Sequence, residues 1–547
     1  MLLVTNALAH LFSAAASSAP PVRDTECGKV SGAADPFAPV DVFTGIRYAA
    51  VEKRWTPPVP LSEVGRCWAP RLLPATKKLP GCVDLGGTGV EDCLTLNVWQ
   101  PRSRAPPRGR PVMVYFHGGD LTGGSAGTAF GKLASHSTGA VIVDVNYRLA
   151  AGGFLSLTQM MHESADKQSS GGFGFLDMLE SLRWVQRNIK GFSGDPSRVT
   201  IFGQSSGGTA VLALLASPLS TGLFSGGMSL SGSPNISMSI DVQRQQHAAI
   251  TRAMHCEGPD AAAVMTCMRA GNLSSGGALQ HAVPQDGDHA NGTLSSPSWA
   301  ESNIFDIPHH LDGLRMPGLA TAGLIGIAPD GIVQSYHEGM SKNVSLIVSN
   351  MAQECGQLPG ASVTKLKGAA CVNFFEKAFS FVSPVTGAAA AKVYAAEIAQ
   401  DCQLAFDSMA ADIEMTCGSS AVALAAAEKR LASETATSAA PVYHVFNAQT
   451  SAGCMGTAGK CYANHGSDLG MACTGKGPRA DALRDAWIEF ATTSRVAAWV
   501  PVDATPAQTT AVVMEDNGTR SVGGWKASTC EFWRQHKLGG QQFWWSD

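Results

Sequence analysis

Three stretches of the chain are apolar without polar alternation, and each predicts a buried β-strand. They are residues 111–116 (PVMVYF), 139–148 (GAVIVDVNYR) and 197–202 (SRVTIF). Continuous apolar runs that are rich in β-branched and aromatic residues are typical of strands covered on both faces.

Residues 176–192, between the second and third runs, carry apolar side chains at helical spacing. The residues that share this face are Leu176, Leu179, Leu182 and Val185, and Gly191 lies past the predicted end. Buried strands separated by helices predict an α/β fold with a mostly parallel central sheet and helices on both faces. In such sheets, chemistry gathers at the carboxyl ends of the strands.

The third predicted strand runs directly into the pattern G-x-S-x-G at residues 203–207 (GQSSG). A strand before this pattern and a helix after it are the context of a nucleophile elbow. The sharp turn lifts the serine hydroxyl above the sheet edge, and glycines avoid collisions on either side. Ser205 is therefore a candidate nucleophile, and a glycine-serine turn without chemistry is the alternative.

A serine nucleophile needs a base, and elbow enzymes carry serine, acid and histidine in that order. His465, in ANHGSDL, is the candidate base, and a solvated loop histidine is the alternative. Glu354 is the candidate acid because it follows the apolar run 346–348. Glu338 is a weaker competitor, since no predicted strand precedes it.

The composition limits the partners that we expect. The chain has 547 residues, enough for a large core, and 40 basic and 44 acidic residues give a net charge of −4. This balance provides no electrostatic reason to expect nucleic acid or an anionic membrane surface. No stretch after the amino terminus reaches the apolar length of a membrane span, so we expect no stable membrane insertion. The oligomeric state stays open.

The amino terminus predicts export. Residues 1–19 are largely apolar and end in small residues, which is typical of a signal peptide; a disordered or helical tail is the alternative. The chain also has 14 cysteines, an even number. Its N-glycosylation sequons begin at Asn235, Asn272, Asn291, Asn343 and Asn517. Together these features favour a glycosylated, disulfide-containing protein that is secreted or held in the secretory-pathway lumen.

Ordered motifs along the chain resemble those of the type-B carboxylesterases, which include cholinesterases and non-catalytic adhesion relatives. The longest are residues 91–101 (EDCLTLNVWQP) and 193–208 (SGDPSRVTIFGQSSGG), with NYRLAAGGF, SLRWVQRNI, LFSGGMSLSGSP and CEFWRQH in matching order. The resemblance implies the α/β-hydrolase fold. It also implies one domain over residues 20–547, after the signal peptide.

The resemblance also implies roles for the candidate residues. Ser205 would be the nucleophile, Glu354 the acid and His465 the base of a serine esterase. Such an enzyme cleaves small-molecule carboxylic esters through an acyl-enzyme intermediate and needs no cofactor.

By the same resemblance, six cysteines pair as Cys82–Cys93, Cys256–Cys267 and Cys417–Cys530, and the connectivity of the other eight stays open. Cys461 and His465 have a spacing that a zinc site could use, with Cys454 nearby. We expect no metal there, because the histidine has a better use in the triad and export favours disulfides.

Three departures from the family pattern bear on function. The loop between Cys82 and Cys93 lacks the tryptophan that holds choline in cholinesterases, so choline esters are not expected as dedicated substrates. Gln204 stands where the family mostly has glutamate, which weakens support for a charged imidazole. The oxyanion motif reads HGGD at residues 117–120, where the family has HGGG.

The resemblance assigns the backbone N–H groups of Gly119, Asp120 and Ser206 to the oxyanion hole. Aspartate tolerates unusual backbone angles, so the N–H of Asp120 can still serve. Its carboxylate would repel a developing oxyanion, and we therefore expect Asp120 to limit ester hydrolysis. Asp120 and Gln204 also motivate an alternative function, that of a catalytically weak or inactive binding or adhesion protein.

Overall fold

The structure is a computed structural model and describes most of the chain. The described residues are 19–164, 170–234, 254–273, 332–339, 344–354, 366–378, 384–433, 440–449, 463–503 and 510–536, with short pieces between 237 and 252 and at 319–320.

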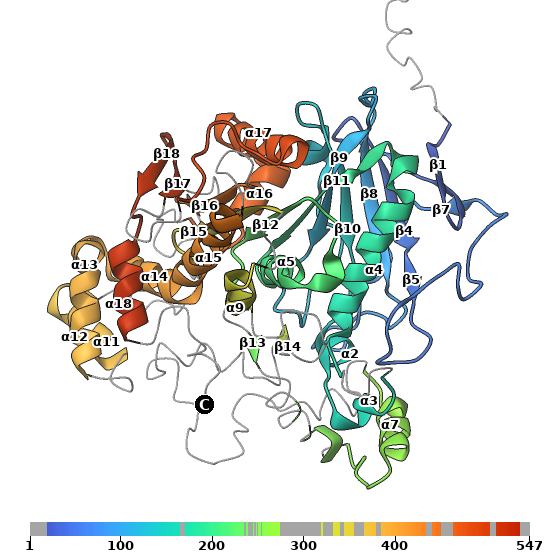
Figure 1. Ribbon diagram of the computed structural model, residues 1–547, viewed down its shortest axis with the longest axis horizontal. Helices are drawn as coiled ribbons and strands as arrows, with labels where there is room; N and C mark the ends of the chain where they lie inside the picture. Colours follow the sequence, from blue (N-terminus) through green and yellow to red (C-terminus); the bar gives the residue numbers. More distant parts are fainter. Residues whose placement is uncertain are drawn as a thin grey trace, which may run out of the picture.

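Among the described residues, eleven strands form a mixed sheet at the centre of the molecule (Figure 1). In spatial order the strands are β18 (Gly518–Gly523), β17 (Thr510–Glu515), β16 (Val442–Asn447), β15 (Ser345–Met351), β12 (Gly226–Leu230), β11 (Gly194–Gln204), β9 (Arg110–Phe116), β10 (Val141–Val145), β8 (Thr95–Pro101), β4 (Val40–Arg47) and β3 (Ala33–Ala34). The strands from β17 to β10 pair in parallel, and the remaining pairs at both edges are antiparallel. The predicted mostly parallel α/β sheet is therefore confirmed.

The three predicted strands correspond to β9, β10 and β11. Every residue of β9 and β10 is buried, as the lack of polar alternation indicates. Successive side chains of β9 enter two different cores: Val112 and Val114 pack on one face of the sheet, and Met113 and Tyr115 pack on the other. A strand buried on both faces needs apolar residues at every position, which explains the continuous run.

Helices cover both faces of the sheet (Figure 1). On the face of Val112 lie α4 (Phe173–Asn188), α5 (Ser206–Ala216), α9 (Ile332–His337) and α15 (Cys417–Ser433). On the opposite face lie α1 (Gly131–Ser135), α16 (Ser467–Thr474) and α17 (Pro478–Thr493). The helix predicted over residues 176–192 begins earlier than expected and gives way at Ile189 to a single 3-10 turn that ends at Phe192.

The remaining elements lie around this core. The short strands are β1 (Val22–Thr25), β2 (Gly28–Ser31), β5 (Ala49–Ala50), β6 (Val59–Pro60), β7 (Leu73–Pro74), β13 (Ser237–Met238) and β14 (Leu319–Ala320). The outer helices are α2 (Ala150–Phe154), α3 (Thr158–Met161), α7 (Ala261–Ala270), α11 (Ala369–Ala378), α12 (Pro384–Val393), α13 (Ala395–Gln400), α14 (Cys402–Ala411) and α18 (Ala527–Gln535).

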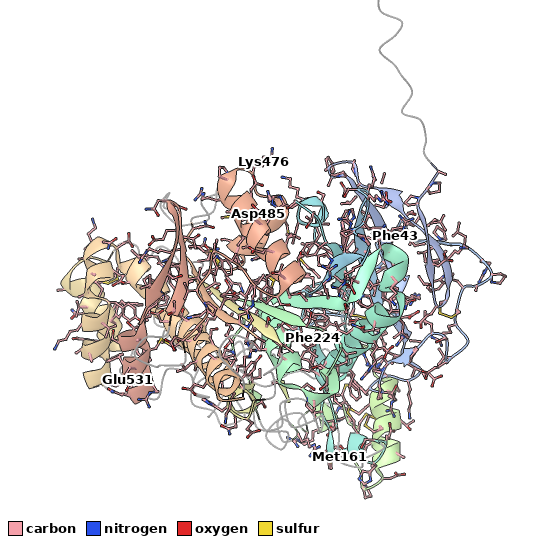
Figure 2. The ribbon with its side chains drawn as sticks, turned by 45° about the horizontal axis from the view of Figure 1, so that its top comes forward. Phe43, Met161, Phe224, Lys476, Asp485 and Glu531 are labelled. Carbon is pink, nitrogen blue, oxygen red and sulfur yellow. A yellow bond between two sulfur atoms is a disulfide. The ribbon has the colours of Figure 1, made fainter. Side chains whose placement is uncertain are left out.

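A separate hydrophobic core joins α11 to α14 with α18, around Phe375, Tyr394, Phe406 and Trp533. Figure 2 shows Glu531 on α18 toward the end of the molecule opposite Phe43 on β4. In this core the indole N–H of Trp533 donates to the Tyr394 hydroxyl at 2.9 Å.

Five disulfides connect described cysteines. Three are Cys82–Cys93, Cys256–Cys267 and Cys417–Cys530, the same pairs that the resemblance implied. The other two, Cys27–Cys67 and Cys371–Cys402, were left open by the sequence. Cys473 is buried with a free thiol. Within the part of the chain that the structure describes, no helix combines the length and apolar character needed to cross a membrane.

Candidate active site

Ser205 occupies a sharp turn between the end of β11 at Gln204 and the start of α5 at Ser206. Its φ of 62° and ψ of −131° lie in a region that residues with a Cβ rarely adopt. The backbone N–H of Ser205 donates to the carbonyl of Leu230 at 2.9 Å, which fastens the turn to the neighbouring strand β12. The serine side chain is partly exposed at the carboxyl end of the sheet.

The two glycines of the motif are required by close packing in this turn. A Cβ on Gly203 would stand 2.3 Å from the carbonyl oxygen of Gly207, and a Cβ on Gly207 would stand 2.1 Å from that of Phe116. Both distances are far below contact distance, so the G-x-S-x-G pattern has a steric cause in this chain.

Glu354 and His465 lie on adjoining loops that pair with each other. The backbone N–H of Gln353 donates to the carbonyl of Ala463 at 3.1 Å, and the N–H of Ala463 donates to the Gln353 side chain at 3.1 Å. Glu354, three residues past the end of β15, is buried at 3% exposure, and one of its carboxylate oxygens accepts the N–H of Met351 at 2.6 Å. The other oxygen lies 2.7 Å from Nδ1 of His465.

The loop of His465 also lies against the serine turn. A Cβ on Gly466 would stand 3.3 Å from the side-chain amide of Gln204, the residue before Ser205. Among the described residues no hydrogen bond joins the Ser205 hydroxyl to His465. Catalytic hydrogen bonds often form fully only when substrate is bound.

Three acidic groups act on His465. Desolvation lowers the pKa of His465, but the hydrogen bond and charge of Glu354, with smaller contributions from Asp468 and Asp120, raise it above its ordinary value. The side chain of His465 keeps about a third of its surface exposed, while that of Glu354 is fully buried. The negative charge of Glu354 therefore favours the imidazolium, and part of the His465 side chain stays exposed.

Asp468, in the first turn of α16, was not singled out from the sequence. It is 1% exposed, and burial with the charge of Glu354 raises its pKa to about 6. One of its carboxylate oxygens accepts the N–H of Leu469 at 2.7 Å, and the other has no hydrogen-bond partner among the described residues. The sequence feature that could have identified Asp468 is its position three residues after His465.

The proposed oxyanion loop approaches the serine from the end of β9. The Tyr147 hydroxyl donates to the carbonyl of His117 at 2.6 Å, and the two rings stack with centroids 4.4 Å apart. A Cβ on Gly118 would stand 2.8 Å from Cβ of Ser205, which shows how closely the loop passes the candidate nucleophile.

Three backbone N–H groups near Ser205 are the candidates for an oxyanion hole. Within the described chain, the N–H groups of Gly119 and Asp120 make no hydrogen bond. The N–H of Ser206 lies at the first position of α5, where a helix provides no internal partner. Unpaired N–H groups beside a candidate nucleophile are what the proposed oxyanion hole requires.

Asp120 has a left-handed backbone, with φ of 58°. Asp120 is exposed, and desolvation raises the pKa of its carboxyl, while the charge of His465 lowers it. The carboxyl of Asp120 therefore lies within electrostatic reach of the candidate base.

Other sequence-predicted residues lie apart from this site or outside the described chain. Glu338 is exposed just past α9, and its carboxylate accepts from Gln334 at 3.1 Å. No group of three or more potential metal ligands occurs among the described residues. Outside the described residues lie positions 1–18 of the predicted signal peptide, the sequons at Asn235, Asn291 and Asn343, and Cys454 and Cys461. Asn272 and Asn517 are exposed.

Comparison with known proteins places the chain in a family. Residues 19–474 match the Carboxylesterase family, and the chain belongs to it. It is 40% identical over 212 residues to fumonisin B1 esterase of Sphingopyxis macrogoltabida, covering 37% of this chain and 38% of that protein. It is 39% identical over 261 residues to liver carboxylesterase 1 of Oryctolagus cuniculus, covering 42% and 44%. These alignments span less than half of either relative.

The fold is similar to that of solved esterase structures. The structure of a PNB esterase superposes with a TM-score of 0.66 at 22% identity, and the match covers 94% of this chain and all of that one. At this identity the similarity shows the fold, which is that of the α/β hydrolases.

Proposed function

We propose that the protein is a serine hydrolase that cleaves carboxylic esters, with Ser205 as nucleophile, His465 as base and Glu354 as acid. The observation that carries the proposal is the 2.7 Å contact between Glu354 and His465, on a loop that lies against the strained turn of Ser205. Family membership supports the same class of reaction.

The reaction proceeds in two acyl transfers. The Ser205 oxygen attacks the ester carbonyl while Nε2 of His465 takes its proton, and the carbonyl oxygen becomes an oxyanion facing the N–H groups of Gly119, Asp120 and Ser206. His465 then protonates the leaving alcohol, which leaves an acyl group on Ser205. Water repeats these steps on the acyl-enzyme and releases the acid. Glu354 holds the imidazole through Nδ1 and stabilises its charged form.

The protein is further proposed to be a single catalytic domain over residues 20–547, preceded by a signal peptide at 1–19. Five disulfides among described cysteines support passage through an oxidising compartment, and hence secretion or residence in the secretory lumen. The exposure of Asn272 and Asn517 supports glycosylation at these two positions.

A second candidate, a weakly active or inactive binding relative, is favoured by one observation. The Asp120 carboxylate lies close enough to the site to interact with His465, where negative charge opposes an oxyanion. The contact between the buried Glu354 and His465 argues for the enzyme, because a protein used for binding alone has no reason to maintain it.

Turnover of p-nitrophenyl esters distinguishes the two candidates. The wild-type protein should hydrolyse a series from acetate to long acyl chains, and the Ser205→Ala variant should lose this activity. If the wild type is active and the Ser205→Ala variant keeps that activity, Ser205 is not the nucleophile. No turnover of any ester by the wild type would favour the binding protein.

A further inference from the structure

The segment that follows the free N–H of Asp120 is held in an unfavourable conformation. Asp120 and Leu121 both have left-handed backbones, with φ of 58° and 57°. Neither is glycine, and consecutive residues with a Cβ rarely adopt this region. Such a conformation persists only where surrounding contacts fix it.

Leu121 is fixed on both sides of its backbone. Its carbonyl accepts the N–H of Ala150 at 2.8 Å, and its N–H donates to the side-chain oxygen of Ser206 at 3.1 Å. Leu121 is 1% exposed and Ser206 is 4% exposed, so water does not replace this contact. The hydroxyl of Ser206 is therefore the acceptor for a buried N–H.

From this contact we propose that the Ser206 side chain is a positioning residue, which aims the Asp120 N–H at the substrate oxyanion. The inference rests on the proposed function. The peptide between Asp120 and Leu121 is held at its nitrogen by Ser206, and this fixes the rotation about the Asp120 backbone. The Asp120 N–H belongs to the preceding peptide, which shares the same Cα.

Ser206 thereby connects the start of α5 to the loop that carries Gly119 and Asp120. The N–H of Ser206, at the start of α5, is one of the three proposed oxyanion donors, and its hydroxyl accepts a hydrogen bond from the loop that supplies the other two. Removing the hydroxyl leaves the Leu121 N–H buried without a partner, and the strained loop then relieves this cost by rotating. A rotated loop weakens binding of the oxyanion and leaves the nucleophile and the base in place.

Ser206→Ala tests the proposal with two readouts, kcat and KM for a p-nitrophenyl ester and the inhibition constant of a trifluoromethyl ketone. The ketone adds to the serine and forms an oxyanion, so its affinity directly measures how well the oxyanion hole stabilises that charge. We expect kcat/KM and ketone affinity to fall together by about 10- to 100-fold, with KM little changed, since losing a donor outright costs about 100- to 1,000-fold. Ser206→Thr, which keeps a hydroxyl, should recover part of both.

Ser220→Ala is the matched control. Ser220 is also buried, and its hydroxyl donates to the carbonyl of Leu214 at 2.6 Å just beyond the far end of α5. This variant should lose stability without loss of ketone affinity. Where Ser206→Ala does not fold, Ser206→Cys replaces it, because a thiol of similar shape is a poor acceptor.

The outcomes separate this inference from the proposed function. An active wild type whose Ser206→Ala and Ser206→Cys variants keep kcat/KM and ketone affinity would overturn the positioning role alone. A wild type without esterase activity would contradict the proposed function and the inference with it. A parallel fall in both readouts that Ser206→Thr partly reverses supports the role of the hydroxyl.

Discussion

Nδ1 of His465 lies 2.7 Å from a carboxylate oxygen of Glu354, although 111 residues separate them in the chain. The two loops meet because β15 and the segment before α16 both end at the carboxyl edge of the sheet, where Gln353 bridges to Asn464. The contact fixes which imidazole nitrogen faces Glu354 and leaves the other for the proposed nucleophile, Ser205.

The first prediction is that Glu354, and not Glu338, is the triad acid. Glu354→Gln should reduce kcat for ester hydrolysis by about 1,000-fold or more, because the amide no longer orients and stabilises the imidazolium. Glu338→Gln is the control and should retain normal turnover, since that carboxylate is exposed and bonded to Gln334. Loss of activity in the control with retention in Glu354→Gln would reverse the assignment.

The second prediction concerns the pH dependence of activity. His465 must be neutral to accept the serine proton, and its pKa is raised in the fold by Glu354, Asp468 and Asp120 against the effect of desolvation. Activity should therefore fall as the pH drops, with a midpoint above about 6.5, the ordinary histidine value. Asp468→Asn removes one negative charge and should move this midpoint to lower pH.

Asp485→Asn provides the control for this shift. Asp485 lies on α17, where its carboxylate contacts His136 at 2.8 Å, and it is not among the groups that shift the pKa of His465. Its removal should leave the midpoint unchanged. Equal midpoints in the wild type and Asp468→Asn would show that Asp468 does not act on the base.

The third prediction is that Asp120 limits hydrolysis. Asp120→Gly should raise kcat/KM for simple carboxylic esters roughly tenfold, about 1.4 kcal/mol, because negative charge no longer lies near the developing oxyanion. The same change should lengthen the lifetime of an organophosphate adduct on Ser205, since a weak base for the attacking water is lost. If both quantities stay at their wild-type values, Asp120 is a turn residue without influence on the reaction.

The fourth prediction concerns the disulfides. Peptide mapping without reduction should recover all five pairs, and the buried Cys473 should react with iodoacetamide after unfolding but not before. Cys417–Cys530 spans a separation of 113 residues, and in the chain-entropy model such a loop stabilises by about 4–5 kcal/mol. The pair Cys82–Cys93, with a separation of 11, should contribute about 3 kcal/mol.

Urea unfolding of the two double serine variants measures this difference. The variant that lacks Cys417–Cys530 should lose more stability than the variant that lacks Cys82–Cys93. The reverse order would mean that native-state strain or residual denatured structure outweighs loop closure.

Much of the sheet could be predicted from the sequence, because strands buried on both faces leave an unbroken apolar run, as at β9 and β10. The turn at Ser205 could also be predicted from the sequence, because close backbone contacts in the turn require its glycines. Glu354 and His465 could be chosen as candidates from their place after a strand and in a small-residue loop, and the resemblance supplied their roles.

Other features depend on contacts between distant segments and left no local pattern. The antiparallel edge strands, the pairs Cys27–Cys67 and Cys371–Cys402, and the burial of Asp468 follow from how the chain folds back on itself. The contact of the Ser206 hydroxyl could not be predicted either, because its partner Leu121 lies 85 residues away in the chain. A short polar side chain in a glycine-rich turn does not indicate what it will contact.

Labelling with a fluorophosphonate tests the central claim most directly, because this reagent reacts with a serine only where a base and an oxyanion hole activate it. The account predicts one modified peptide containing Ser205, loss of ester turnover in proportion to labelling, and no labelling of Ser205→Ala or His465→Ala. Absence of labelling in a folded wild-type protein, or labelling at another serine with turnover lost, would contradict it.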